Sequence, residues 1–210
     1  MKHHRFTNSK GTIMVRDTES GGDFKSKLEC HGFIRWVSQM DVVLVRLQKP
    51  QITYLDKDGV KRRYTGDLEV LFHPRANRRP LVIECKYSAM LRRDPGLVEK
   101  LERVGDAMRR LGRDFLVQTE HDVHADGFKM MKFVFSHRNN DPHPAQQEIM
   151  DCMALHKSLT LGQLVAALRT NLVSQCEIVP EVWRLVAVQK LAVNYNEILN
   201  HAAKISLPSV

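Results

Sequence analysis

Apolar residues recur at helical spacing over residues 24–40 and at strand spacing directly afterwards. The stripe through Leu28 and Val37 predicts an amphipathic helix, which also carries Glu29. Short apolar runs, interrupted by a turn of Asp and Gly residues, then predict one strand followed by a β-hairpin. The predicted strands cover residues 42–45, 51–54 and 60–64, and the turn covers 56–59.

Further strands and a long helix complete the first pattern. Asp94 and Pro95 predict the start of a helix that ends at Gly112. The segments 67–72 and 81–86 predict strands that pair as neighbours in one sheet, across a polar loop. Additional strands are predicted at 115–118 and 132–135, and a segment rich in Asn, Asp and Pro at 139–144 breaks regular structure.

The last third of the chain predicts a small, mainly helical domain. Thr160 and Gln163 have the spacing of a capping box at the start of a helix. Three helices followed by a β-like tail are compatible with a winged helix, and other small helical packing modules share that outline. The predicted helices cover 145–157, 160–168 and 180–188, and the tail covers 191–207.

The pattern as a whole predicts an α/β protein in three parts. Residues 1–22 are polar, lack a sustained apolar period and are interpreted as a mobile or partner-ordered arm. An α/β domain is expected over residues 23–140 and the mainly helical domain over 145–210. Hydrophobic residues make up 43% and charged residues 27% of the chain, which is ordinary for a folded globular protein.

Composition excludes several classes of protein. No apolar stretch approaches the roughly 20 residues of a membrane-spanning helix. The basic N-terminus is not followed by the apolar segment of a secretory signal, so we expect a cytoplasmic protein. The four cysteines form no C-x-x-C pair and are interpreted as free thiols, and His121 and His124 lack the partner pair of a zinc finger.

The positive charge is concentrated in the first part of the chain. The formal net charge is +8, and residues 1–150 carry 27 of the 32 Lys and Arg against 20 of the 24 Asp and Glu. Attraction for a polyanion is therefore expected in that part, although on composition alone a basic surface indicates solubility as readily as nucleic-acid binding. Candidate DNA contacts are Gln48, Arg62, Arg63, Arg78, Arg79, Arg92 and Arg93, most of them in or beside predicted loops.

Asp67, Glu84 and Lys86 form the pattern D-x16-E-x-K across the two neighbouring strands. Side chains alternate along a strand, so Glu84 and Lys86 are expected on one face. Asp67 and Glu84 then offer carboxylates to Mg²⁺, for which Mn²⁺ substitutes, and the main-chain carbonyl of Cys85 offers a further oxygen. Lys86 is expected to orient the attacking water or to offset developing phosphorane charge. The alternative is a purely structural ion pair.

Several segments together resemble a known family. The D-x16-E-x-K pattern and the order of elements resemble the PD-(D/E)xK restriction-endonuclease-like superfamily, with Gly66 in place of the leading Pro. More specifically, the chain resembles the TnsA family, the endonuclease subunit of heteromeric cut-and-paste transposases. The segments that carry this likeness are 26–29, 47–52, 64–67, 84–87 and 115–120.

The resemblance implies roles for individual residues and partners. It makes Glu29 the helix carboxylate of the active site, Asp67 and Glu84 metal ligands, and Lys86 the catalytic lysine. The implied fold is a restriction-endonuclease-like mixed sheet flanked by helices, followed by a winged-helix domain. The implied activity is hydrolysis of the 5′, non-transferred strands at transposon ends in a bacterial cytoplasm. The implied partners are the DDE-type transposase subunit TnsB and the AAA+ regulator TnsC, the latter through the C-terminal domain.

Three other readings remain open at this point. One is a stand-alone restriction or repair endonuclease that needs no transposase. Another is a non-catalytic DNA-binding adaptor that uses the same domain as a scaffold. The third is an unrelated α/β protein with a structural acid–base pair, which predicts no dependence on divalent metals.

Overall fold

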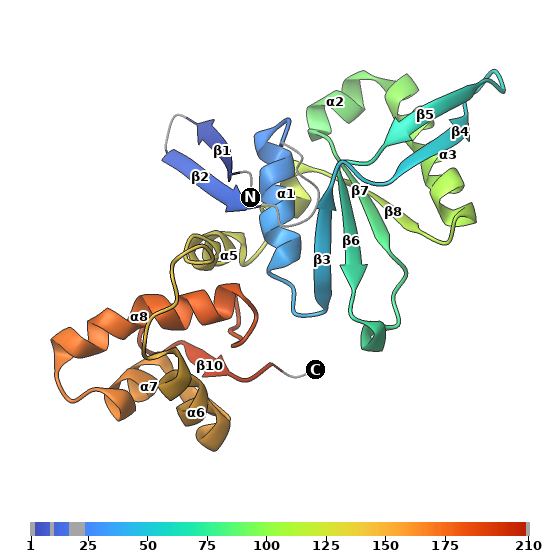
Figure 1. The fold of residues 1–210 in the computed structure, drawn as a ribbon. Helices are drawn as coiled ribbons and strands as arrows, with labels where there is room; N and C mark the ends of the chain where they lie inside the picture. The colour runs from blue at the N-terminus through green and yellow to red at the C-terminus, as the bar shows by residue number, and fades with distance from the viewer. Residues whose placement is uncertain (1–2, 9–10, 17–23, 209–210) are drawn as a thin grey trace. The chain divides into compact units, whose positions relative to one another are not determined.

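The chain forms two compact units of mixed α/β structure, residues 1–125 and residues 126–210 (Figure 1). The computed structural model describes residues 3–8, 11–16 and 24–208. The first unit contains a mixed β-sheet, and the second is mainly helical. The boundary between the two units falls between residues 125 and 126. The sequence pattern predicts it later, at residues 139–144; the observed boundary is earlier because residues 128–135 belong to the second unit.

The sheet of the first unit has four strands in the order β3-β6-β7-β8. Strand β3 (Val42–Leu47) pairs antiparallel with β6 (Leu68–Phe72), and β6 pairs antiparallel with β7 (Leu81–Cys85). Strand β8 (Asp114–Gln118) runs parallel to β7. This arrangement confirms the predicted pairing of the strands that follow Asp67 and contain Glu84. The short helix η1 (Pro74–Ala76) lies in the loop between β6 and β7.

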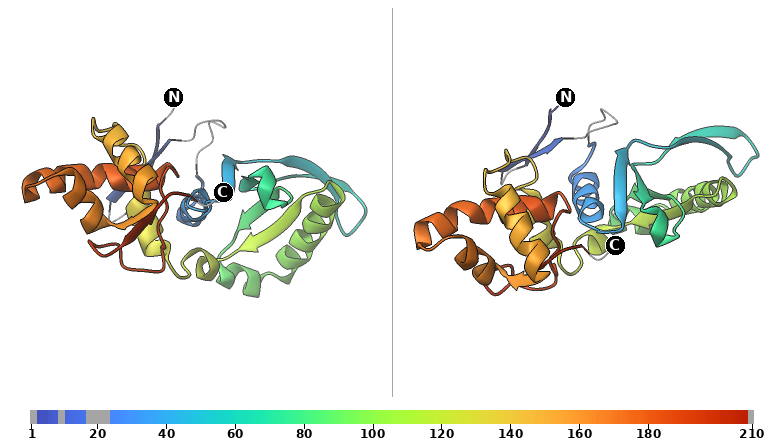
Figure 2. Two further views of the ribbon diagram at one scale, coloured as in Figure 1. Left: turned by 90° about the horizontal axis from the view of Figure 1, so that it is seen from below. Right: turned by 60° about the horizontal axis from the view of Figure 1, so that its bottom comes forward.

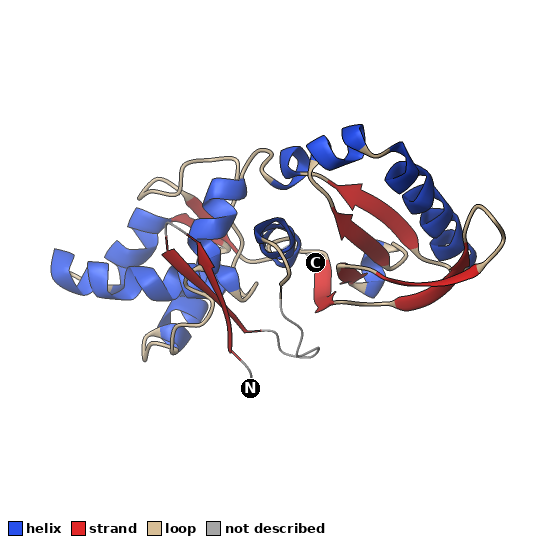
Figure 3. Cartoon of the chain, turned by 90° about the horizontal axis from the view of Figure 1, so that it is seen from above, coloured by secondary structure: helices blue, strands red, loops and turns tan. Residues whose placement is uncertain are grey.

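Helices cover both faces of this sheet (Figure 3). Helix α1 (Lys27–Val37) packs against β3, β6 and β7, and Gly32 faces the side chains of Leu68 and Cys85. Because side chains alternate along β7, Val82 lies on the other face, in an apolar cluster with residues of α3 (Pro95–Arg110). Asp94 caps α3 by accepting a hydrogen bond from the main-chain N–H of Leu97, as the Asp-Pro sequence predicts.

A β-hairpin and a short helix flank this core. Strands β4 (Gln51–Leu55) and β5 (Lys61–Thr65) pair antiparallel through the predicted turn and run together beyond the sheet (Figure 2). Tyr54 and Tyr64 anchor the hairpin in the apolar cluster under α3. Helix α2 (Ser88–Arg93), which was not predicted, directly follows the Glu84–Lys86 segment, and α4 (Glu120–Val123) follows β8.

The N-terminal segment contains regular structure that the polar sequence did not predict. Residues 3–8 and 11–16 form an antiparallel two-stranded hairpin, β1 (His3–Asn8) and β2 (Gly11–Arg16). The interpretation of residues 1–22 as a mobile or partner-ordered arm stays a prediction. Residues 1–2, 9–10 and 17–22 of the predicted arm lie outside the described residues, as does residue 23.

The second unit contains helices α5 (Phe128–Phe135), α6 (Gln146–His156), α7 (Leu161–Leu168) and α8 (Leu172–Ala187). Thr160 and Gln163 form the predicted capping box at the start of α7. Strand β10 (Lys204–Ser206) pairs with β9 (Ser158–Thr160), and a bridge joins Ala192 to Ser206. Arg184 forms a buried ion pair with Glu181, 2.7 Å between Nε and Oε2.

Two predictions for this unit are wrong. The predicted strand at 132–135 is helical, because Phe128, Met131, Val134 and Phe135 are buried at helical spacing rather than in alternation. The helix predicted from residue 180 begins eight residues earlier at Leu172, with Asn171 accepting a hydrogen bond from Ser174, so Pro180 lies inside it. Of the residues described, no helix is long and apolar enough to cross a membrane.

Gly66 provides a test of how closely the hairpin approaches the sheet. A methyl group at this position would lie 2.5 Å from Cγ1 of Val82 and 2.9 Å from the main-chain oxygen of Lys49. We therefore expect Gly66→Ala to lower the free energy of unfolding by about 1–3 kcal/mol, measured by chemical denaturation. Gly96→Ala is the matched control, since its added methyl meets only Oδ1 of Asp94, at 3.3 Å. Equal stability of the Gly66→Ala variant and the wild type would contradict this packing.

Candidate active site

Main-chain hydrogen bonds hold Asp67 at the start of β6. Its N–H donates to the oxygen of Ile83 at 3.1 Å, and its oxygen accepts from the N–H of Gln48 at 2.9 Å. The N–H of Cys85 donates to Oδ2 of the Asp67 carboxylate at 2.9 Å. Asp67 is therefore fixed against the end of β7 by both its main chain and its side chain.

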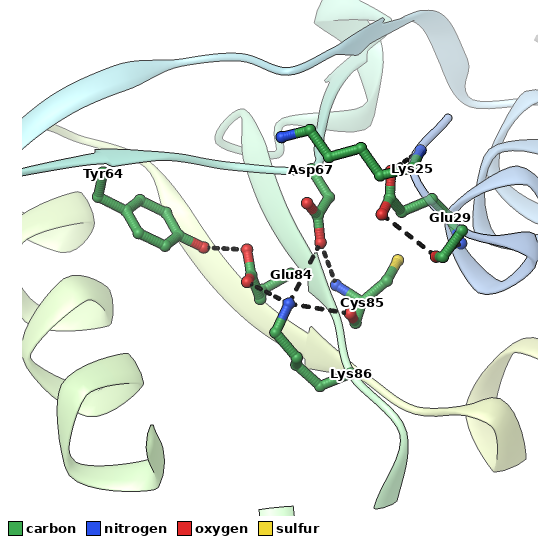
Figure 4. Close-up of polar contacts among 8 residues, drawn as sticks. Lys25, Glu29, Tyr64, Asp67, Glu84, Cys85 and Lys86 are labelled. Carbon is green, nitrogen blue, oxygen red and sulfur yellow. Dashed lines mark hydrogen bonds and ion pairs between the residues drawn. The ribbon is translucent and has the colours of Figure 1, made fainter. Parts of the chain in front are cut away.

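Glu84 and Lys86 lie beside Asp67, as the alternation along β7 predicts (Figure 4). The Nζ atom of Lys86 is 2.6 Å from Oε1 of Glu84 and 3.9 Å from Oδ2 of Asp67. The same ammonium donates to the main-chain oxygen of Cys85 at 3.3 Å. Oxygen atoms from three residues thus surround one cation, and both carboxyl groups are largely buried.

The electrostatics of the site reflect an excess of negative charge. Burial and the nearby charge of Glu84 raise the pKa of Asp67 to about 7, with a smaller contribution from Glu29, while the N–H of Cys85 and the charge of Lys86 oppose the shift. Burial alone would lower the pKa of Lys86, but its hydrogen bond to Glu84 and the surrounding carboxylates raise it above the ordinary value. Lys86 is therefore a cation at neutral pH.

Cys85 contributes its main chain rather than its thiol. Burial, with the charges of Asp67, Glu29 and Glu84, raises the pKa of the thiol above its ordinary range, so the sulfur stays protonated. The side chain points toward Gly32 of α1, on the face of β7 opposite Glu84. The carbonyl oxygen, in contrast, lies within reach of Lys86.

Glu29 lies on α1, the element predicted for it, and is buried. Its carboxylate accepts hydrogen bonds from the main-chain N–H of Lys25 at 3.0 Å and from the hydroxyl of Ser26 at 3.2 Å. Figure 4 shows its carboxyl group on the side of α1 that faces Asp67, and its charge makes a small contribution to the raised pKa of Asp67. The side chain of Lys25 extends over Asp67 (Figure 4).

Tyr64 is a member of the site to which the sequence assigned no role. Its hydroxyl donates a hydrogen bond to Oε2 of Glu84. Burial and the charge of Glu84 raise the pKa of Tyr64, so the hydroxyl remains protonated. The available signal was position alone: Tyr64 ends the returning strand of the hairpin, three residues before Asp67.

The segment after Lys86 is fixed from β8 and α4. The main-chain N–H of Lys86 donates to the oxygen of Gln118 at 3.1 Å. Glu120 accepts hydrogen bonds from the N–H and the hydroxyl of Ser88 at 2.8 and 2.6 Å, and these bonds lower the pKa of Glu120 to about 2. Both ends of the short link between β7 and α2 are thereby held in place.

The donor set fits a hard divalent cation. Within the described part of the chain, no three His, Cys, Asp or Glu side chains form a group that could hold a metal ion. The candidate set consists instead of two carboxylates, from Asp67 and Glu84, and the carbonyl of Cys85. All three place an oxygen around the Lys86 ammonium, and oxygen is the ligand type that Mg²⁺ and Mn²⁺ prefer.

The structure separates the predicted DNA contacts into two groups. Gln48 is bonded to Asp67 through the main chain, Arg62 and Arg63 lie on β5, and Arg92 and Arg93 are exposed at the end of α2. Arg78 and Arg79 lie in the loop between β6 and β7, at the opposite end of these strands from Asp67 and Glu84. Arg78 pairs there with Asp41 and stacks on Phe72. Those two arginines are not brought to the site.

The raised pKa of Asp67 predicts that its charge destabilises the metal-free fold. The ordinary pKa is 3.8 and the folded value is about 7, so stability is lost as the pH rises from about 4 through 7. In EDTA, Asp67→Asn should therefore unfold with a free energy higher than wild type by on the order of 1 kcal/mol or more at pH 8. The difference should disappear below about pH 4. A difference that is constant with pH, measured by urea denaturation, would refute this.

Comparison with known proteins found neither a family model that matches the chain nor a curated protein of similar sequence. Sequence similarity therefore assigns the chain to no family. The features that bear on function are the residues gathered around Lys86 and the motifs that supply them.

Proposed function

We propose that this protein is a metal-dependent endonuclease that hydrolyses phosphodiester bonds in double-stranded DNA. The observation that carries the proposal is the convergence of three oxygen donors, from Asp67, Glu84 and the main chain of Cys85, on the ammonium of Lys86. Two carboxylates and a lysine on adjacent strands, next to a buried sheet, are costly unless they are paired or functional.

Asp67, Glu84 and the Cys85 carbonyl would hold Mg²⁺ or Mn²⁺. When bound, such an ion lowers the pKa of a water molecule and neutralises charge on the phosphodiester. The N–H of Cys85 already fixes one oxygen of Asp67, and Tyr64 and Lys86 each engage one oxygen of Glu84. The two carboxylates are thus oriented before any ligand arrives.

Lys86 stabilises charge in this proposal rather than accepting a proton. Its pKa lies above the ordinary value, so the side chain carries a positive charge and protons to donate at neutral pH. In hydrolysis, a water molecule gives up a proton to solvent and its oxygen forms a bond to phosphorus. The bond to the leaving oxygen breaks, that oxygen takes a proton from solvent, and negative charge grows on the phosphoryl oxygens in the transition state. An ammonium next to these oxygens stabilises the transition state.

The substrate is proposed to be duplex DNA because exposed cations lie on β5, which carries Tyr64, and on α2, which follows Lys86, and a polyanion would neutralise them. The outer face of β5 exposes Lys61 and Arg63, for which the described residues include no ion-pair partner. Arg62, the intervening residue, is instead paired with Asp56 at 2.8 Å. Arg92 and Arg93 add charge on α2, directly after Lys86 and Tyr87.

The finer fold is part of the proposal. The order helix, hairpin, Asp strand, Glu-x-Lys strand, helix and strand supports a restriction-endonuclease-like domain in the first unit. In the second unit, α6, β9, α7 and α8 are followed by a segment that returns through Ala192 and β10, and β10 contacts both β9 and Ala192. That order supports a winged helix.

The motif resemblance narrows the proposed reaction to that of a TnsA-type subunit. As such a subunit, the protein would cut the 5′, non-transferred strands at transposon ends, while TnsB cuts and joins the 3′ ends. TnsC would contact the C-terminal unit. Residues 151–210 carry only 5 Lys and Arg against 4 Asp and Glu, which favours a protein partner for that part over DNA.

Strand-specific cleavage tests the proposal. End-containing duplex DNA is incubated in Mn²⁺ with the partner transposase and either wild type or Asp67→Ala. We expect 5′-strand cuts to fall by at least 100-fold in the variant, while 3′-strand cuts remain, because the variant removes one of the three oxygen donors. Identical 5′ cuts from a folded Asp67→Ala protein would exclude the catalytic assignment and leave a DNA-binding adaptor. Wild-type cutting without the transposase would favour a stand-alone nuclease.

Two pairs of basic residues, Lys61 with Arg63 and Arg78 with Arg79, predict different effects on DNA binding. The double variant Lys61→Ala with Arg63→Ala should weaken duplex binding. The slope of the logarithm of the association constant against the logarithm of salt concentration should fall in magnitude by roughly 1–2, because each phosphate contact contributes about 0.9 to that slope. Arg78→Ala with Arg79→Ala removes the same charge at the far end of the sheet and should leave the slope unchanged. Fluorescence anisotropy in Ca²⁺ measures both. Equal losses from the two pairs would contradict the proposed DNA position.

A further inference from the structure

Tyr64 lies where a rigid aromatic ring can direct a hydroxyl at the candidate metal site. It belongs to β5 and pairs across the hairpin with Ile52. The ring is buried, with its centroid 6.2 Å from that of Phe115 in an edge-to-face arrangement, and it packs in the cluster that contains Val82 and Val104. The apolar contacts hold the ring, so the direction of the hydroxyl is set by the core rather than by the site.

The hydroxyl engages the oxygen of Glu84 that Lys86 does not contact. Oε2 of Glu84 accepts from Tyr64, and Oε1 lies 2.6 Å from Nζ of Lys86. Hydrogen bonds to both oxygens fix the rotation of the carboxylate about its last side-chain bond, which is otherwise broadly distributed. Oε1 is thereby directed toward the oxygens of Asp67 and Cys85 that share the same ammonium.

We propose that Tyr64 is a positioning residue that orients the Glu84 carboxylate for metal binding, an inference that rests on the proposed nuclease function. Partners that hydrogen-bond to a ligating carboxylate set its orientation, and their removal typically costs 10–100-fold in metal affinity or activity. Tyr64 itself contacts neither metal nor DNA in this account. It also ties the hairpin that carries Lys61 and Arg63 to the strand that carries Glu84.

Tyr54 provides a matched control in the same hairpin. Tyr54 and Tyr64 are each 7% exposed and belong to the same apolar cluster. The hydroxyl of Tyr64 reaches Glu84, whereas Tyr54 lies beyond Ile52 along the hairpin, opposite Arg62. Replacing either tyrosine by Phe removes one oxygen and keeps the ring.

The test measures Mn²⁺ binding to the full chain by isothermal titration calorimetry. Tyr64→Phe should raise the dissociation constant about 10–100-fold, and Tyr54→Phe should leave it at the wild-type value. Cleavage by Tyr64→Phe should fall at limiting Mn²⁺ and recover toward wild type at saturating Mn²⁺, while duplex affinity in Ca²⁺ stays unchanged. A Tyr64→Phe protein that binds Mn²⁺ as wild type does would overturn the inference.

A double-variant comparison separates positioning from general stability. In a Glu84→Ala background, adding Tyr64→Phe should cause no further loss of Mn²⁺ affinity, because the hydroxyl acts through the carboxylate. A further loss of similar size in that background would show that the ring or the fold is responsible and would also overturn the inference. A wild-type chain that binds no Mn²⁺ would instead contradict the proposed function on which the inference rests.

Discussion

The hydrogen bond from the main-chain N–H of Cys85 to the carboxylate of Asp67 is the constraint on which the rest of the site depends. It joins the start of β6 to the end of β7, so the register of an antiparallel strand pair determines where the acid lies. With that register fixed, alternation places Glu84 and Lys86 beside Asp67, and the carbonyl of Cys85 points into the same space. A shift of one residue would send Glu84 to the opposite face, toward α1.

Charge balance explains why the site is arranged as it is. The carboxyl groups of Asp67 and Glu84 share the half-buried ammonium of Lys86, and burial together with the charge of Glu84 raises the pKa of Asp67. Lys86 and the N–H of Cys85 offset part of this charge, and Tyr64 donates to Glu84. The remaining negative charge suits a divalent cation, which would take the position that the ammonium shares with the three oxygens. The same carboxyl groups thus affect both the stability of the fold and the proposed chemistry.

Much of the first unit could be predicted from sequence, because its strands and helices have clear hydrophobic periods and are bounded by turn and capping residues. Asp-Pro marked the start of α3, and the spacing of Glu84 and Lys86 marked a shared face. Tertiary contacts determine two features that the hydrophobic pattern does not predict: the helical structure of residues 132–135 and the partner of the Tyr64 hydroxyl. Residues 132–135 were apolar enough to suggest a strand, but their burial follows a helix that joins the second unit. Tyr64 resembled an ordinary strand aromatic, since its hydroxyl meets Glu84 only when the hairpin packs under α3.

Anomalous diffraction from crystals soaked in Mn²⁺ tests the central claim most directly, because it locates the ion without relying on activity. The account predicts a peak in contact with the carboxylates of Asp67 and Glu84 and with the main-chain oxygen of Cys85, at about 2.0–2.3 Å, and Nζ of Lys86 displaced from the centre of the three. No peak at these oxygens at saturating Mn²⁺, with Lys86 still bonded to Glu84, would contradict it and identify the cluster as a structural ion pair.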